Sequence, residues 1–273
     1  MKSPRQVAYT EIDDLRLRHR WVSKLAVAAG RLYCLGDPNV RARLRAFHAV
    51  RILAREQVHD VLDAGCGRTG KLGWFGGIAP IAHALSRILR ETQIVGYDFD
   101  QGIVQHNRGC AKRSGANNLE FRRFDLRAEP PIHLFDGVVF SDIARDAVRD
   151  GPFIEAVARH VRPGGVLVLI VPSKFQLTLN SSFRRRLVET GFDFNDLADV
   201  MFKSGLSVQR MGYITGSPAG AVALLMGRIS EISFPLMMFV FPFLMAASIG
   251  ELFRYPAAGD AIIAIGRRDT GAA

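Results

Sequence analysis

A glycine-rich turn and three aspartates are the residues of this sequence whose types and spacing could do chemistry. The turn is GCGRTG at residues 65–70, and Asp63 stands two residues before it. Asp98 and Asp125 follow later, each at the end of a short run that contains apolar residues. Glycines let a backbone pass close beneath a nucleoside, because no Cβ intervenes. The combination predicts a site for a nucleoside-containing cofactor.

Two cofactor classes fit the G-x-G-x-x-G spelling: dinucleotides such as NAD, and the methyl donor S-adenosylmethionine. The position of Asp63 favours the second class, since a carboxylate there is unfavourable beside a pyrophosphate and suits a cationic sulfonium and amino group. Asp98 could accept hydrogen bonds from both ribose hydroxyls in either class. Asp125 would lie near the adenine amino group, and a third acid of this kind is not expected of a dinucleotide site. Each acid taken singly could instead cap a turn or lie on the surface.

The hydrophobic pattern predicts the elements that position these aspartates. Short apolar runs alternate with helical periods from residue 58 onward, which predicts βαβ units and a doubly wound α/β fold. The aspartates then lie near the ends of the first three strands, at one edge of the sheet. Strands are expected at 58–64, 93–98, 119–125, 135–141, 166–171, 206–214 and 261–268, and helices near 78–89, 101–114 and 152–160.

Four segments resemble, in order, the motifs of the class I S-adenosylmethionine-dependent methyltransferases. They are VLDAGCG (61–67), GYDFD (96–100), RRFDL (122–126) and VRPGGVLVLIVP (161–172). The resemblance covers roughly residues 58–215 and the last strand. It implies S-adenosylmethionine as the cofactor, and a seven-stranded, mostly parallel sheet whose last strand is antiparallel.

The resemblance also implies roles for residues around the turn. Asp63, Gly65 and Gly67 would hold the methionine moiety, and Cys66 between the glycines is counted among the cofactor-binding residues of the turn. Because no base is evident beside Cys66, it is interpreted as a small filler rather than a nucleophile. Asp98 would bind the ribose. Two features depart from the family: the third glycine comes one residue late, and the two aspartates are 98 − 63 = 35 residues apart, against about 20 in such units.

Further roles follow for residues at the next strand ends. Phe99 would line the adenine, and Asp125 with Leu126 would meet its edge. Ser141 and Asp142, after the fourth strand, would face cofactor and substrate. Asp142 is the first candidate for a base if the acceptor is a hydroxyl.

The chain divides into an N-terminal helical extension (1–57) and a methyltransferase domain (58–273) that carries an apolar insertion at about 215–260. By the family's topology, this connection emerges at the carboxyl ends of the strands, over the active-site face. Residues 232–249 are 18 residues without a charge, which just meets the length of a transmembrane helix. A single crossing would leave the last strand on the wrong side of the bilayer. The insertion is therefore interpreted as a lid, a peripheral membrane contact through 219–256, or an oligomer surface.

A helix is predicted from Asp37 to about Glu56, because Asp-Pro is a typical helix start. Its basic stripe is more typical of a solvated face than of a phosphate site. Three histidines carry no evident chemistry: His83 is expected to be structural, and His106 and His160 to lie on the surface. Leu44, Phe47, Val50 and Leu53 fall on the apolar face of the helix, and Arg41, Arg45, His48, Arg51 and Arg55 on the basic one.

Composition limits the class of protein and its partners. The sequence has 36 Lys and Arg residues and 26 Asp and Glu residues, which gives a net charge of +10. This charge either indicates an anionic partner or belongs to a basic surface that only contacts solvent. The three cysteines form no disulfide framework, and no spacing predicts a metal site. No secretory leader is evident at the start, so a cytoplasmic protein is expected. The same protein could also contact the inner face of the membrane peripherally.

The predicted reaction is methyl transfer to a small apolar or lipid-linked acceptor. An RNA or protein methyltransferase is the alternative enzyme, which the net charge favours slightly. Against it, no aromatic and basic stacking module is evident, and FSDI (140–143) replaces the NPPY-like tetrapeptide. A non-catalytic, membrane-associated protein that retains the fold is the alternative of a different class.

Overall fold

The computed structural model describes residues 40–67, 81–141, 151–175, 191–233 and 256–271, and positions 236, 239, 240, 243, 246 and 251. Within these ranges seven strands form one sheet in the order β3-β2-β1-β4-β5-β7-β6. The first five strands pair in parallel, and β7 is antiparallel to both neighbours. The expected sheet is thereby confirmed. Its strands are β1 Asp60–Ala64, β2 Gln93–Asp98, β3 Leu119–Arg123, β4 Phe135–Ser141, β5 Val161–Pro172, β6 Leu206–Ile214 and β7 Ala261–Arg268.

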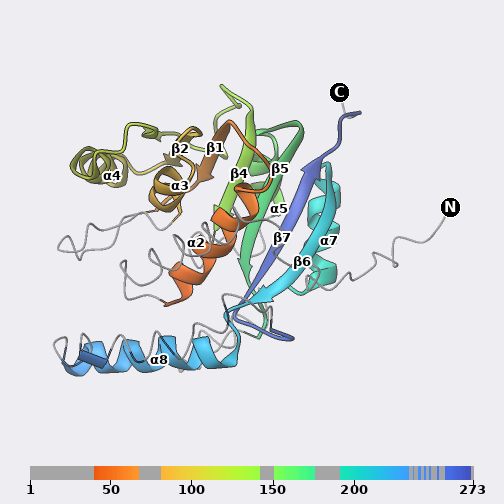
Figure 1. Ribbon diagram of the computed structural model, residues 1–273. Coiled ribbons are helices and arrows are strands. Elements are labelled where there is room, and N and C mark those ends of the chain that lie inside the picture. Colours follow the sequence, from red (N-terminus) through yellow and green to blue (C-terminus); the bar gives the residue numbers. More distant parts are fainter. Residues whose placement is uncertain are drawn as a thin grey trace.

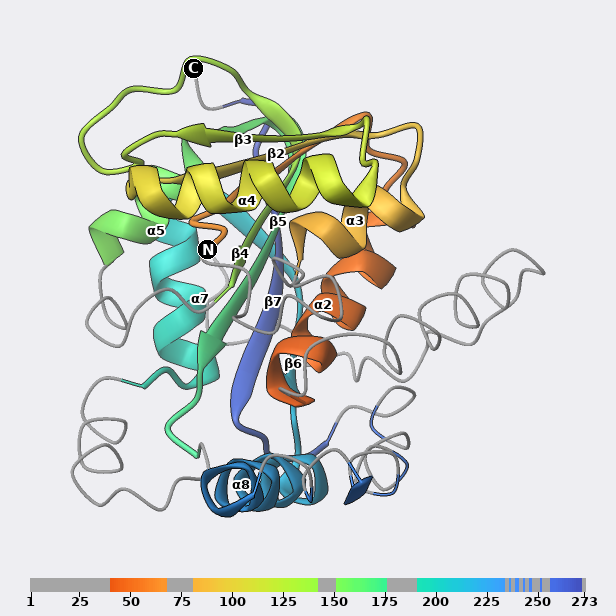
Figure 2. The same cartoon turned by 90° about the vertical axis from the view of Figure 1, so that its left-hand side faces the viewer.

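Helices cover both faces of this sheet (Figures 1 and 2). One face carries α2 (Val40–Leu53), α3 (Ala82–Ile88) and α4 (Gln101–Ser114). The opposite face carries α5 (Gly151–Ala158) and α7 (Phe194–Lys203). This is the doubly wound arrangement expected of right-handed βαβ crossovers.

A sixth described helix, α8 (Ser217–Ile232), lies across the end of the sheet in Figure 1. Ala261 at the start of β7 pairs with Ile214, the end of β6, and with Pro172, the end of β5. The 215–260 connection therefore leaves the sheet at the carboxyl ends of its parallel strands, as expected. No helix in the described ranges is both long and apolar enough to cross a bilayer.

Strand β5 is longer than the predicted 166–171 because the preceding turn is also part of the ladder. Phe135 N donates to His160 O at 2.8 Å, and Phe135 pairs with Val161 before the register shifts. The RPGG segment is thus a bulged start of the strand rather than a loop before it.

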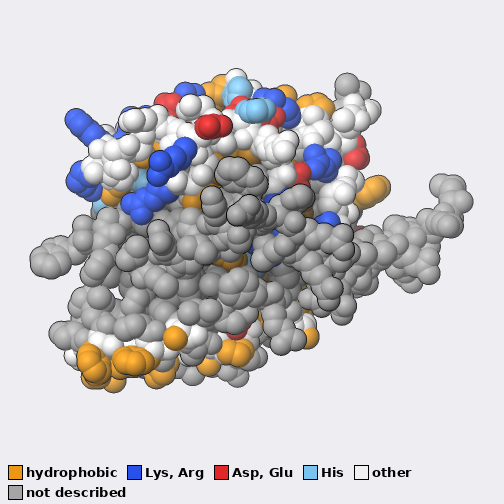
Figure 3. All heavy atoms as spheres, in the orientation of Figure 1, with side chains coloured by type: hydrophobic (Ala, Val, Ile, Leu, Met, Phe, Trp, Pro, Cys, Tyr) orange, Lys and Arg blue, Asp and Glu red, His pale blue; other side chains and the backbone are white. Residues whose placement is uncertain are grey.

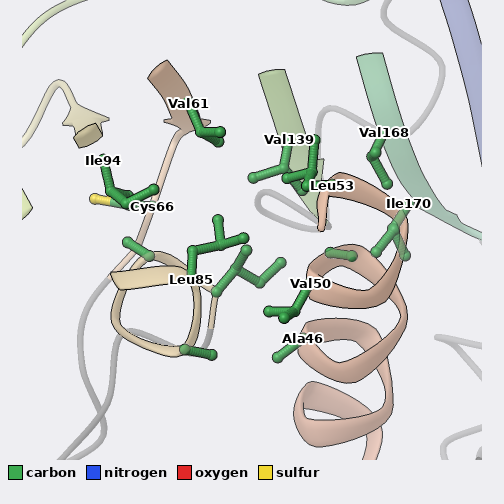
Figure 4. Close-up of a cluster of buried hydrophobic side chains, with 14 of the residues drawn as sticks. Ala46, Val50, Leu53, Val61, Cys66, Leu85, Ile94, Val139, Val168 and Ile170 are labelled. Carbon is green, nitrogen blue, oxygen red and sulfur yellow. The ribbon is translucent and has the colours of Figure 1, made fainter. Parts of the chain in front are cut away.

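Alternate residues of the central strands enter two separate cores, as a sheet covered on both faces requires. Val168 and Ile170 of β5 join one core, and Leu167 and Leu169 join the other. Figure 4 shows the first core, in which side chains of α2 and α3 meet those of β1, β2, β4 and β5. Its labelled members include Ala46, Val50, Leu53, Val61, Leu85, Ile94 and Val139.

The prediction that the basic stripe of α2 is a solvated face is wrong. Arg45 and His48 are 9% and 1% exposed, and the neighbouring Arg43 is 6% exposed. Because α2 contacts α3 and α8 as well as strands β4 and β5, little of its circumference remains for solvent. Arg41 Nε donates to Asp260 Oδ2 at 2.7 Å, which ties α2 to the residue that precedes β7.

The histidines divide differently from expectation. His83 is buried, as expected of a structural residue, and His106 is half-buried. His160, expected on the surface, is fully buried, and its Nδ1 lies 3.0 Å from Ala156 O. The turn between α5 and β5 is so short that His160 faces the core, where it meets the ring of Phe124 edge-on.

Replacing Gly96 with Ala is expected to lower the free energy of unfolding by about 1–3 kcal/mol, because a Cβ at Gly96 would lie 2.5 Å from the buried Phe121 ring. The matched control is Gly109→Ala in α4, where a Cβ meets only the flexible end of Arg113 at 3.3 Å. That change should stabilise by about 0.5–1 kcal/mol through helix propensity. Urea unfolding of both variants measures the difference, and equal effects would contradict the packing argument.

Candidate functional site

The glycine turn after β1 requires left-handed backbone. Gly65 and Gly67 have φ values of 65° and 62°, a region that side-chain-bearing residues rarely adopt. A Cβ built on Gly67 would meet no atom of the described residues within 4 Å, so these residues leave the side-chain position of Gly67 open. Cys66 N donates to Tyr97 O at 2.9 Å, which fastens the turn to β2. The third glycine, Gly70, lies outside the described residues.

Asp63 lies in β1 beneath this turn and is 3% exposed. Its Oδ2 accepts a hydrogen bond from Ala82 N, at the start of α3, at 2.9 Å. Burial raises the pKa of Asp63 to about 7, a rise opposed by the Ala82 N–H and reinforced by the charge of Asp98. A cation bound nearby would favour the ionised carboxylate and lower this pKa.

Asp98 ends the neighbouring strand and holds the turn directly. Its Oδ2 accepts from Gly67 N at 3.1 Å, and its Oδ1 accepts from Asp100 N at 2.9 Å. The parallel register pairs Asp63 with Gly96, so both carboxylates lie at the same edge of adjacent strands.

Cys66 is buried between the glycines, and its geometry suits a filler. Burial, with the charges of Asp63 and Asp98, raises the pKa of the thiol far above its ordinary range. A thiol that stays protonated is a poor nucleophile. Phe99, next to Asp98, is 69% exposed and so presents its ring to the space outside the sheet edge.

The remaining predicted site residues lie in different surroundings. Asp125 follows β3, and its Oδ1 accepts from Arg127 N at 2.9 Å, which caps a turn. Leu126 is 5% exposed and packs in the core with Phe124. Ser141 ends β4, half-buried, while Asp142 lies outside the described residues. Of the predicted residues outside the turn, Asp98 therefore hydrogen-bonds to it directly, and Asp63 holds the start of α3 from the strand that leads into it.

Sequence reasoning missed Asn107 in α4. This side chain is fully buried, and its Nδ2 donates to Gly67 O at 2.8 Å and contacts Cys66 Sγ at 3.6 Å. The turn is thus fixed from a helix 40 residues later in the chain. The available signal was a polar residue on the buried stripe of α4, in line with Val104 and Ala111.

Comparisons with known proteins place this arrangement among solved structures. No protein-family model matches the sequence, and no curated protein matches it. The methyltransferase domain of bacterial CtHen1-C is similar in structure, with a TM-score of 0.53 at 15% identity over 85% of this chain and 100% of that chain. A SAM-dependent methyltransferase from Aquifex aeolicus has a TM-score of 0.50 at 14% identity, over 90% and 97%. The chain has the fold of S-adenosylmethionine-dependent methyltransferases.

The fold by itself leaves the reaction open. The [4+2]-cyclase SpnF is also similar, with a TM-score of 0.52 at 17% identity over 82% of this chain and 81% of that one. The function therefore depends on the residues of the site and not on the fold alone.

Proposed function

We propose that this protein is an S-adenosylmethionine-dependent methyltransferase whose acceptor is small and apolar or lipid-linked. The observation that carries the proposal is the pair of carboxylates at adjacent strand ends around an open glycine turn. Asp98 accepts from Gly67 N, and Asp63 lies buried under the same turn. A dinucleotide would bring a pyrophosphate to this turn, where buried acids are unfavourable.

The residues of the turn fit the parts of S-adenosylmethionine. Gly65 gives the turn its left-handed backbone, Gly67 leaves space for the methionine moiety, and the ionised form of Asp63 complements the positive charges of that moiety. Asp98 would accept hydrogen bonds from the ribose hydroxyls, and the exposed ring of Phe99 would cover the adenine. Bound there, S-adenosylmethionine supplies an electrophilic methyl group on its sulfonium.

Three further residues complete the proposed contacts. Asp125 with Leu126 borders the adenine edge, where the backbone beside the buried Leu126 is the available group. Ser141 faces the cofactor from the end of β4. Much of the rate would come from holding the acceptor in line with the sulfonium at near-attack distance.

The thermal stability of the chain with each cofactor tests the proposal. S-adenosylmethionine and its demethylated product should stabilise the protein by about 2.7 kcal/mol at a hundred times their dissociation constant. NAD at the same concentration should leave the melting temperature unchanged. The assignment would be overturned if NAD alone stabilised the protein. It would also be overturned if neither S-adenosylmethionine nor its demethylated product did so.

A further inference from the structure

The outer face of α8 is apolar although it faces solvent. Its inner face, with Ala219, Val222 and Met226, is buried at 8% exposure or less. On the outer face, Leu225 is 48% and Ile232 is 83% exposed. A surface helix of a globular protein ordinarily turns charged residues outward. Here the inner face is apolar, and the outer face is apolar apart from Arg228 and is uncovered in the described structure.

The helical positions after α8 continue this surface. Leu236, Phe239 and Phe243 are 48%, 72% and 69% exposed, and the two phenyl rings lie 6.4 Å apart. These residues are spaced by three and four, as on one face of a helix. We call Leu225, Ile232, Leu236, Phe239 and Phe243 the apolar face. Figure 3 shows hydrophobic side chains gathered along the lower edge of the molecule, on the side of α8, whereas the basic side chains drawn in this view lie in its upper half.

Charge indicates which kind of partner fits the apolar face. Arg228 is exposed between Leu225 and Ile232, where a long basic side chain can reach headgroup phosphates while its stem stays in apolar surroundings. Arg228 and Glu231 are the only charged residues in 217–249. The chain carries a net charge of +10, which attracts it to an anionic bilayer and opposes the approach of a second copy.

We propose that the apolar face is a membrane-docking surface that lies in the plane of an anionic bilayer. α8 is anchored at the carboxyl edge of the sheet, the edge at which Asp98 and the glycine turn lie. Docking therefore brings that edge to the bilayer, from which a lipid or lipid-linked acceptor can enter without crossing water. The part that concerns the acceptor rests on the proposed methyl transfer, whereas the docking itself does not.

Vesicle flotation of the full chain tests the surface. Vesicles of phosphatidylcholine mixed with phosphatidylglycerol should carry the protein upward, more strongly at low salt than at high salt. The double variant Phe239→Asp with Phe243→Asp should lower vesicle binding at least tenfold, because it lacks the two phenyl rings that would be buried in the apolar layer. Arg228→Gln should lower it about fivefold and lessen the preference for the anionic lipid.

The matched control is Phe202→Asp. Phe202 is 78% exposed but lies on α7, away from the apolar face, so its replacement should leave flotation unchanged. All four positions are exposed, so the variants should fold, and far-UV circular dichroism checks this.

Three results would overturn the docking proposal: no flotation of the parent chain, flotation that survives the double Phe variant, or equal loss in Phe202→Asp. A concentration-dependent dimer that the double variant dissociates, without vesicle binding, would assign the face to a second copy instead. Stabilisation by the demethylated cofactor is measured on the same proteins. Cofactor binding without flotation rejects only the docking, and flotation without cofactor binding rejects only the methyltransferase.

Discussion

Replacing Asp63 with Asn is expected to weaken S-adenosylmethionine binding about 10- to 100-fold while it stabilises the free protein. The loss of affinity follows because the variant has no negative charge to complement the cation. The gain in stability follows because an ionised carboxylate no longer has to be buried at neutral pH, and the Asn oxygen can still accept from Ala82 N. Titration calorimetry and urea unfolding measure the two effects on one sample.

The stability difference between Asp63→Asn and the parent should depend on pH, because Asp63 titrates with a raised pKa. The pKa of Asp63 is raised by burial from 3.8 to about 7, so its stabilising contribution is present below about pH 4 and is lost as the pH rises through 7. At pH 8 the Asn variant should exceed the parent by on the order of 2–4 kcal/mol, and at pH 4 the two should be similar. Cofactor affinity of the parent should rise as the pH passes 7.

Asp60→Asn is the matched control, since Asp60 begins the same strand at its amino edge and lies 2.6 Å from His133. It should leave cofactor affinity unchanged. If Asp63→Asn binds cofactor as tightly as the parent, Asp63 serves only the start of α3 and the assigned contact is wrong.

Replacing Asp98 with Ala is expected to weaken cofactor binding about 100-fold or more. Two effects combine: the ribose hydroxyls lose their proposed acceptor, and Gly67 N loses the carboxylate that holds the turn. The affinity for the demethylated product, measured by titration calorimetry, reports the sum of both effects.

The control for this change is Asp100→Ala two residues later. Asp100 Oδ1 accepts from Gly102 N and Ile103 N and caps α4, so its loss should cost about 1 kcal/mol of stability and little affinity. Equal affinity losses in both variants would mean that a general disturbance of the β2–α4 junction, and not the ribose contact, is being measured.

Periodicity predicted the elements well because the central strands β1, β4 and β5 are buried along most of their length and α4 is buried on one face. That pattern is local, so all seven strands and the helix at 101–114 could be located from sequence. The α7 helix was not located, and neither was the bulged start of β5, whose pairing with Phe135 involves residues distant in sequence.

The same distinction between local pattern and tertiary packing applies to the candidate site. The sequence by itself determined that Asp63, Asp98 and the glycines lie at one edge of the sheet, because parallel strands bring their carboxyl ends to the same edge. Only the tertiary structure decided that Asp63 is buried against the start of α3, that Asn107 fixes the turn, and that Arg45 and His48 of the α2 stripe are buried. Burial depends on which surfaces distant segments cover, and periodicity reports the face of an element but not its neighbour.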